Sequence, residues 1–308
     1  MPKNYLAFGD PTRAETVAYL AKRGRLGRKP PYDAMSPARE CVTEQILSEI
    51  GRTLPLVIAK SKLVRLPSKG APDVRFMSRM FLRRGEEVLI HGVEIAAAFL
   101  GSQQRELHEV FRLEDPIEER KFFNVATMIE VLRFFGRNPI ERNALVDAFG
   151  RMLMFDALVG AQDRHPENWG VIESVVDPSA PRRFAPLYDT ARGLFWNSPD
   201  TQLPNHSIEK YAERAHPVFG CTESDSGKDV NHFRLAEYVL YEADPVARAS
   251  AQQVLRAYSP GLIRRLLKRR YSRIISPLRI AYIMDLLKVR HARLMAILHN
   301  VHGRASSQ

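Results

Sequence analysis

The apolar pattern of this chain of 308 residues changes character near Gly92. Before Gly92, a segment rich in Leu, Val and Ile covers residues 54–66, and apolar and polar residues alternate over 74–82, so both segments predict strands. Beyond it, apolar residues recur at three- and four-residue intervals, which predicts helices over about 122–135 and 140–159. A strand-containing start followed by a helical remainder predicts an α+β fold with two lobes of unequal size.

We place the boundary between the lobes after residue 82, which gives an N-lobe of residues 1–82 and a C-lobe of residues 83–308. Within the N-lobe, Ser36 and Pro37 are typical of a helix start, and apolar residues then recur every four positions up to Gly51. This pattern predicts a helix over about 37–50. Residues 1–35 are rich in Gly, Pro and basic residues and predict turns with short strands, and residues 198–231 predict a long loop.

The composition is that of an ordinary soluble globular protein, with 45% hydrophobic and 26% charged residues. Cys41 and Cys221 lie far apart and outside any C-x-x-C spacing, so the sequence supports neither a disulfide framework nor a zinc ribbon, and it favours a reducing compartment. The best apolar run, residues 93–100, contains a glutamate and is too short to span a bilayer. We therefore expect a cytoplasmic protein with no membrane partner.

The net charge of +11 is concentrated at one end of the chain. Residues 254–308 contain twelve Lys and Arg residues against one acid, Asp285, and so hold the whole excess. This distribution excludes a protein coated in positive charge, and we expect no direct DNA binding. Three explanations stay open for the basic helices: a solvated face, a docking surface for an acidic protein or tRNA-bearing partner, or an anionic membrane. Few aromatic residues accompany them, so base stacking is not indicated.

Two polar loops that follow apolar segments hold the candidate chemistry. Residues 159–170 have glycine near both ends and a proline in the middle, and present Asp163, His165 and Asn168; residues 184–189 deliver Asp189. Phosphoryl transfer needs one carboxylate to accept the proton of the attacking hydroxyl and oxygen ligands for Mg²⁺, and these residues supply both. Protein kinases use the same Asp-x₄-Asn interval. Because such a pair arises by chance about once in a chain of this length, a turn held by Asx side chains stays an alternative.

The residues around these positions resemble a known family. Leu-Val-Gly-Ala-Gln-Asp-Arg-His-Pro-Glu-Asn-Trp-Gly at 158–170 and Ala-Pro-Leu-Tyr-Asp at 185–189 are similar to the catalytic and metal-binding loops of HipA-like serine/threonine kinases. Phosphatidylinositol kinases are similar at Asp-Arg-His-x-x-Asn but continue with His-x-Asp-Phe-Gly, which is missing here. Residues 75–81, 86–92 and 155–157 also resemble the family, so the resemblance covers roughly 36–196.

The resemblance implies a two-lobed kinase-like fold and a role for each loop residue. It makes Asp163 the catalytic base, His165 a residue that organises the catalytic loop, and Asn168 and Asp189 the Mg²⁺ ligands. For the neighbouring positions we expect Arg164 and Glu167 at the surface, and Trp169 packed between the loop and the lobe.

The residues that would bind ATP are harder to assign. Glu44 matches the helical glutamate that pairs with the ATP-binding lysine in the family, but the strand motif that presents this lysine is missing. Lys29 and Lys22 are the upstream candidates, whereas Lys60 follows Glu44 and so comes in the wrong order. By analogy with the family, we expect adenine to bind the backbone of the lobe connection, from Arg79 through Phe81 to residue 82.

The resemblance implies an ATP- and Mg²⁺-dependent kinase acting on Ser or Thr hydroxyls of a protein. Full-length family members are toxins that phosphorylate translation factors such as aminoacyl-tRNA synthetases and are restrained by an antitoxin; we expect this chain to lack their additional N-terminal subdomain. Two alternatives remain. In the first, the chain is a small-molecule or lipid kinase with residues 198–231 as its substrate pocket. In the second, it is a catalytically impaired adaptor that binds an acidic partner, and the missing lysine motif favours this one.

Overall fold

A computed structural model describes residues 3–8, 17–23, 36–66, 73–101, 122–222 and 230–305 of the chain. Its N-terminal part is a four-stranded antiparallel sheet in the order β1-β2-β4-β3. The strands are β1 (Lys3–Phe8), β2 (Val17–Arg23), β3 (Ser61–Leu66) and β4 (Asp73–Arg79). Strand β3 lies within the predicted segment 54–66, β4 overlaps the predicted segment 74–82, and the short strands before residue 35 were also expected.

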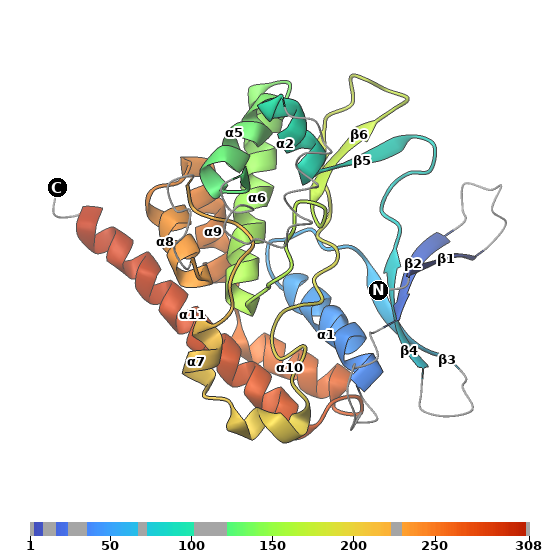
Figure 1. Ribbon diagram of the computed structural model, residues 1–308, viewed down its shortest axis with the longest axis vertical. Coiled ribbons are helices and arrows are strands. Elements are labelled where there is room, and N and C mark those ends of the chain that lie inside the picture. The colour runs from blue at the N-terminus through green and yellow to red at the C-terminus, as the bar shows by residue number, and fades with distance from the viewer. Residues whose placement is uncertain are drawn as a thin grey trace.

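Helix α1 (Ser36–Gly51) follows β2 and confirms the helix predicted over 37–50. Figure 1 shows it between the sheet and the large group of helices. This position explains why α1 is buried nearly all round, including polar residues such as Glu44, Gln45 and Ser48. A polar residue at such a place needs a partner inside the protein.

The chain passes from β4 to a second, three-stranded antiparallel sheet across residues 80–86. This sheet has the order β5-β6-β7, with β5 (Glu87–His91), β6 (Gly170–Ser174) and β7 (Arg183–Phe184). The sequence indicated a mainly helical chain after Gly92 and missed β6 and β7, because both are short and become strands only by pairing with β5. The predicted lobe boundary at residue 82 falls in the connection between the sheets and stays a prediction.

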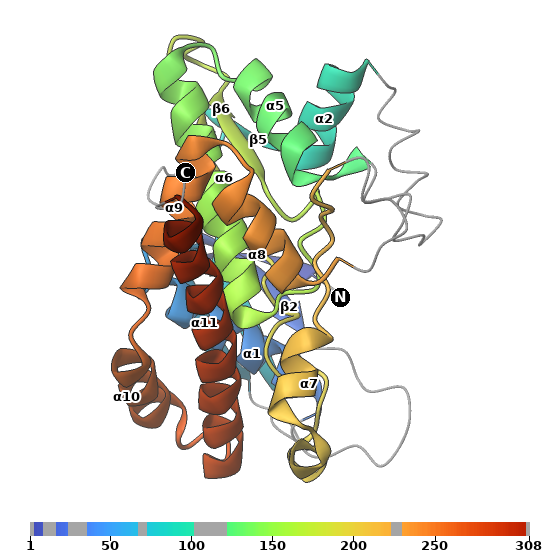
Figure 2. The ribbon, with the colours of Figure 1, turned by 90° about the vertical axis from the view of Figure 1, so that its left-hand side faces the viewer.

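The helical part is built around α6, whose residues from Leu145 to Val159 are mostly apolar and largely buried. Helices α5 and α6 confirm the two predicted over 122–135 and 140–159, and α9 and α11 flank α6 in both views (Figures 1 and 2). The helices are α2 (Gly92–Leu100), α5 (Val125–Phe135), α6 (Pro139–Val159), α8 (His232–Tyr241), α9 (Pro245–Ala257), α10 (Pro260–Tyr271) and α11 (Pro277–Ala305).

The long loop predicted over 198–231 is wrong in its first half. A 3₁₀-helix, η1 (Asp200–Asn205), and a short helix, α7 (Ile208–Glu213), occupy this region. Each has only six residues, too few to show a repeating apolar pattern. The mixed fold itself, with strand sheets first and helices after, is the α+β class that the sequence predicts.

Both cysteines are buried, and neither forms a disulfide. Within the described ranges, none of the helices combines the length and the apolar character that crossing a membrane requires.

Candidate active site

The first candidate loop begins where α6 stops at Val159. Gly160 caps the helix in the left-handed conformation, with φ of +68°, and donates its N–H to the Asp156 carbonyl. Only glycine adopts this conformation without strain. The chain therefore turns back and carries Asp163, His165 and Asn168 along the end of the helix.

Arg164 fixes this loop from the inside. Its guanidinium donates to both oxygens of Asp156 on α6, over 2.8 and 2.9 Å, and to the carbonyls of Asn168 and Tyr188, over 3.1 and 3.0 Å. The residue is 3% exposed, so its expected surface position is wrong. Burial raises the pKa of Asp156, an effect that Arg164 opposes. One buried cation thus joins α6 to both candidate loops, and it brings Asn168 and Asp189 to one place.

Trp169 and Glu167 lie where the sequence predicts. The Trp169 ring is buried and stacks on Phe184, with centroids 5.7 Å apart and planes 3° apart, and it also contacts Phe149 of α6. The Trp169 carbonyl accepts the N–H of Gly92 at the start of α2. The ring therefore packs the loop against the helical lobe, while Glu167 is exposed.

Asp163, the candidate base, lies between two nitrogen donors. His165 Nε2 and Arg192 Nη1 are each 3.0 Å from Asp163 Oδ1. The Asp163 side chain is 20% exposed and therefore reachable from solvent. The sequence predicted that His165 organises this loop. It gave no signal for Arg192, which comes three residues after Asp189 and belongs to no recognised motif. The two donors orient the carboxylate.

Asn168 is oriented by its own loop. Its Nδ2 donates to the main-chain carbonyl of Asp163 over 2.6 Å. Because the amide nitrogen is used in this way, the amide oxygen is the atom that this side chain offers to a cation.

Asp189 meets the N-terminal sheet through Lys22 of β2. Lys22 Nζ is 2.6 Å from Asp189 Oδ1 and 2.8 Å from Glu44 Oε1 of α1. Asp189 itself has a φ of +52°, a left-handed conformation that is rare outside glycine and often found at functional sites. Between the two lysine candidates, the structure brings Lys22 to Glu44, whereas Lys29 lies outside the described residues.

This cluster of Lys22, Glu44 and Asp189 is strongly coupled. Burial favours the neutral form of Lys22 and so acts to lower its pKa. The carboxylates of Glu44 and Asp189 outweigh burial, and the pKa of Lys22 is raised. Burial raises the pKa of Glu44 to about 7 despite Lys22. Glu44 Oε2 is buried without a hydrogen-bond partner in the described part of the chain. A cation shared by two carboxylates is therefore the central electrostatic feature of the site.

The remaining predicted nucleotide residues lie along the connection after β4. The N–H groups of Arg79 and Met80 donate to the carbonyls of Lys60 and Ala18, so they complete the sheet. The Arg79 side chain is exposed, and the Phe81 ring lies 5.7 Å from that of Tyr188, next to Asp189. Lys60 is exposed, in line with its exclusion on sequence order.

The donor set suits Mg²⁺, which takes one or two protein oxygens and keeps its other positions for water and phosphate. Asn168 Oδ1 and the Asp189 carboxylate are the two candidate ligands. Among the residues that the structure describes, His, Cys, Asp and Glu side chains form no group of three or more able to hold a metal by themselves.

Comparison with known proteins identifies the fold. No protein-family model and no curated protein matches the chain. It is similar to the crystal structure of the proinflammatory kinase CtkA of Helicobacter pylori, with a TM-score of 0.70 and 13% identity over 98% of this chain and 95% of that one. It is also similar to HipA in the Shewanella oneidensis toxin–antitoxin complex with HipB and operator DNA, with a TM-score of 0.52 and 13% identity. That match covers 97% of this chain and 65% of HipA. The chain therefore has the HipA-like kinase fold that its loops led us to expect.

Proposed function

We propose that the protein is an ATP- and Mg²⁺-dependent phosphotransferase that acts on Ser or Thr hydroxyls of a protein. The observation that carries this proposal is the contact of Lys22 with both Glu44 and Asp189. Kinases hold ATP phosphates with a lysine that a helical glutamate orients, next to a metal-binding aspartate. The same three residue types meet here from β2, α1 and the second loop.

In this function, each residue of the candidate site has one role. Lys22, held by Glu44, binds the ATP phosphates, and the lobe connection around Phe81 binds adenine. Asn168 and Asp189 hold Mg²⁺, which neutralises the charge of the phosphates when it is bound. Asp163 accepts the proton of the substrate hydroxyl, while His165 and Arg192 keep its carboxylate oriented.

Retention of Asp163, Asn168, Asp189 and the Lys22–Glu44 pair favours an active kinase over the adaptor alternative. The sequence lacks the family's strand motif around the lysine, but Lys22 and Glu44 still form a lysine–glutamate pair. A translation-factor substrate and an antitoxin partner stay predictions from the resemblance, supported by the likeness to HipA, which was solved with HipB. We also propose that the basic helix α10 docks an acidic partner or substrate.

The test is transfer of radiolabel from ATP to the protein itself and to a cell lysate in the presence of Mg²⁺. We expect Asp163→Asn and Asp189→Asn to lose the label and the matched control Asp177→Asn, at an exposed turn, to keep it. Equal labelling in all four proteins would contradict the kinase assignment, and label that appears only on small molecules or lipids would favour that alternative.

A further inference from the structure

Helix α11 carries two buried arginines, Arg279 and Arg290, on one side. Eleven positions separate them, which is about three turns of an α-helix, so their side chains leave the helix in nearly the same direction. Arg279 is 6% exposed and Arg290 is fully buried. Helix α11 runs along α6 and α7 (Figures 1 and 2). Because a buried guanidinium needs acceptors inside the protein, the partners of each arginine show which parts of the chain α11 supports.

Arg290 holds the end of α6, where the loop of Asp163 begins. Its Nε donates to the Ala157 carbonyl over 2.7 Å, and its Nη1 donates to the Ala212 carbonyl of α7. Ala157 is in the last turn of α6, whose carbonyls find no partner within the helix. The guanidinium also packs against Gly160, since a Cβ there would lie 3.3 Å from Arg290 Cζ and Nη1. Arg290 therefore fixes the point at which the chain turns toward Asp163.

The charge of Arg290 has no carboxylate beside it. In the described part of the chain it forms no ion pair, and its Nη2 is buried without a hydrogen-bond partner. Burial and the nearby cation of Arg293 lower its pKa to about 9, so the side chain is charged at neutral pH. The partial negative charge at the end of α6 favours a cation there. A buried cation without a carboxylate is a poor source of stability, and such exceptions are expected at functional positions.

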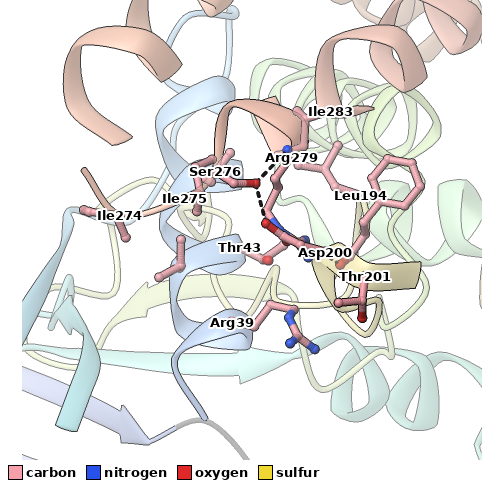
Figure 3. Close-up of a pocket in the computed structure, with 13 residues that line it drawn as sticks. Arg39, Thr43, Leu194, Asp200, Thr201, Ile274, Ile275, Ser276, Arg279 and Ile283 are labelled. Carbon is pink, nitrogen blue, oxygen red and sulfur yellow. Dashed lines mark hydrogen bonds and ion pairs between the residues drawn. The ribbon is translucent and has the colours of Figure 1, made fainter. Parts of the chain in front are cut away.

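Arg279 holds the segment that follows the loop of Asp189. Its Nη1 donates to the Phe195 carbonyl over 3.1 Å, and its Nη2 donates to the Ser198 carbonyl. Its Nε donates to the Asp200 carboxylate over 2.7 Å, a contact that Figure 3 shows. Phe195 comes three residues after Arg192. Arg279 therefore fixes the backbone from which Arg192 reaches the candidate base.

The two segments that α11 binds are also joined to each other. The Gln162 N–H donates to the Arg192 carbonyl over 2.8 Å, and the Leu194 N–H donates to the Val159 carbonyl over 3.0 Å. The Arg192 and Asp163 side chains then meet at 3.0 Å. The position of the Asp163 carboxylate thus depends on two backbone segments, each of which is bound by one arginine of α11.

We propose that Arg290 and Arg279 are positioning residues that, through these two segments, hold Asp163 where it accepts the proton of the substrate hydroxyl. This role rests on the proposed kinase function, whereas the order of the two segments does not. The nucleotide is bound by Lys22 and the lobe connection, which belong to other elements. Loss of either arginine should therefore slow phosphoryl transfer and leave ATP binding unchanged.

The kinetic test compares Arg290→Met and Arg279→Met with the wild type in the radiolabel transfer assay. We expect kcat to fall about tenfold or more in each variant while KM for ATP stays within about twofold. Arg290→Lys keeps the cation and should recover part of kcat. Arg248→Met is the matched control, because Arg248 also binds carbonyls at a helix end, those of Tyr241 and Ala243 after α8. It should keep kcat.

Thermal unfolding establishes that each variant is folded at the assay temperature, and Arg290→Lys and Arg279→Met carry the test if Arg290→Met is not. An unchanged kcat in the variants of both arginines would overturn the proposal. A KM for ATP that rises in step with the loss of kcat, or an equal loss of kcat in Arg248→Met, would overturn it as well.

Hydrogen exchange tests the order of the segments without nucleotide. The amides of Ala161 and Gln162 donate to carbonyls of Asp156 and Arg192. We expect both amides to exchange about tenfold faster or more in Arg290→Met, relative to amides in the middle of α6, and to be unchanged in Arg248→Met. Exchange that follows the middle of α6 would show that Arg290 contributes only to global stability and would refute the proposal. A wild type that transfers no phosphate, together with faster exchange in Arg290→Met, would count against the kinase function alone.

Discussion

Lys22 is the residue on which the proposed function most depends, because its single ammonium is within 2.8 Å of two carboxylates. We predict that Lys22→Met lowers the affinity for Mg-ATP by about tenfold or more, since the phosphates lose their cation. Lys60→Met, at an exposed lysine in the neighbouring segment, should change the affinity little. Calorimetric titration measures both.

Removing Lys22 also leaves Glu44 buried without its cation, which destabilises the fold by about 3–5 kcal/mol where such a carboxylate stays charged. The double variant Lys22→Met/Glu44→Gln removes that charge and should recover stability but not nucleotide affinity. If the double variant binds Mg-ATP as the wild type does, Lys22 is not the phosphate-binding lysine.

Glu44 gives a prediction for the pH dependence of stability. Burial raises its pKa to about 7, above the usual value of 4.5, so the folded state holds a proton that the unfolded state releases between these two values. The contribution of Glu44 to the free energy of unfolding is therefore greatest below pH 4.5 and falls as pH rises to about 7, by up to about 1.4 kcal/mol per pH unit. Urea unfolding across this range should show the wild type losing stability relative to Glu44→Gln as pH rises.

The matched variant Glu237→Gln, at a partly exposed side chain of α8, gives the baseline for this comparison. A wild-type curve parallel to that of Glu44→Gln from pH 5 to about pH 8 would be inconsistent with a raised pKa of Glu44.

At the scale of single residues, the sequence indicated the candidate site residues better than it indicated their partners and their burial. Asp163, Asn168 and Asp189 stand in recognisable loops, but nothing in the sequence distinguishes buried Arg164 from a surface arginine, because its partner Asp156 lies eight residues earlier on another element. Arg192 approaches Asp163 from 29 residues away. The choice between Lys22 and Lys29 likewise depends on the register of β2 against β4, which pairs Lys22 with Phe76.

The contact between α6 and α9 gives a prediction at the scale of elements. A Cβ at Gly150 of α6 would lie 2.6 Å from the Ala247 carbonyl oxygen and 2.8 Å from the Ala247 Cα of α9. Both are backbone atoms, so the helices would have to separate. We predict that Gly150→Ala lowers the free energy of unfolding by about 1–3 kcal/mol, although alanine is the better helix former by about 1 kcal/mol.

Gly261→Ala in α10 is the matched control for Gly150→Ala. A Cβ there meets only the end of the Arg265 side chain, at 3.6 Å. This variant should be neutral or more stable, because helix propensity then acts alone. Urea unfolding compares the two, and a Gly150→Ala protein as stable as Gly261→Ala would refute the close packing of α6 on α9.

Long periodic helices were predictable, whereas elements that depend on distant partners were not. The apolar patterns of α1, α5 and α6 extend over eleven residues or more, which is long enough for a helical repeat to be recognised. Strand β6 has five residues and is defined by its antiparallel pairing with β5, a distant segment that places His91 opposite Gly170 and Glu87 opposite Ser174. The 3₁₀-helix η1 and helix α7 have six residues each, so neither is long enough for a repeat of apolar residues to indicate it.

At the scale of the whole molecule, positive side chains gather on α10, an element that contributes none of the candidate active-site residues. The basic side chains of α10 and the turn after it are exposed and form the basic face of α10: Arg264, Arg265, Lys268, Arg269, Arg270 and Arg273. Only one of them has a carboxylate partner in the described part of the chain, Arg270 with Glu49 of α1. Tyr258 and Tyr271 are buried beneath, so neither offers a ring for stacking a nucleic acid base. The face therefore favours an acidic protein over an RNA.

The basic face of α10 gives the prediction for a partner. A glutamate-rich peptide should bind with a Kd that rises steeply as salt rises, because exposed charges are screened beyond about 10 Å at 0.1 M salt. The triple variant Arg264→Gln/Arg265→Gln/Lys268→Gln should lose about tenfold or more in affinity. The double variant Lys210→Gln/Arg214→Gln on the exposed side of α7 and its C-terminal cap should lose little. Fluorescence anisotropy with the peptide and with a single-stranded RNA of equal charge measures both. Tighter binding of the RNA, or equal losses in the triple and double variants, would contradict an acidic protein partner at α10.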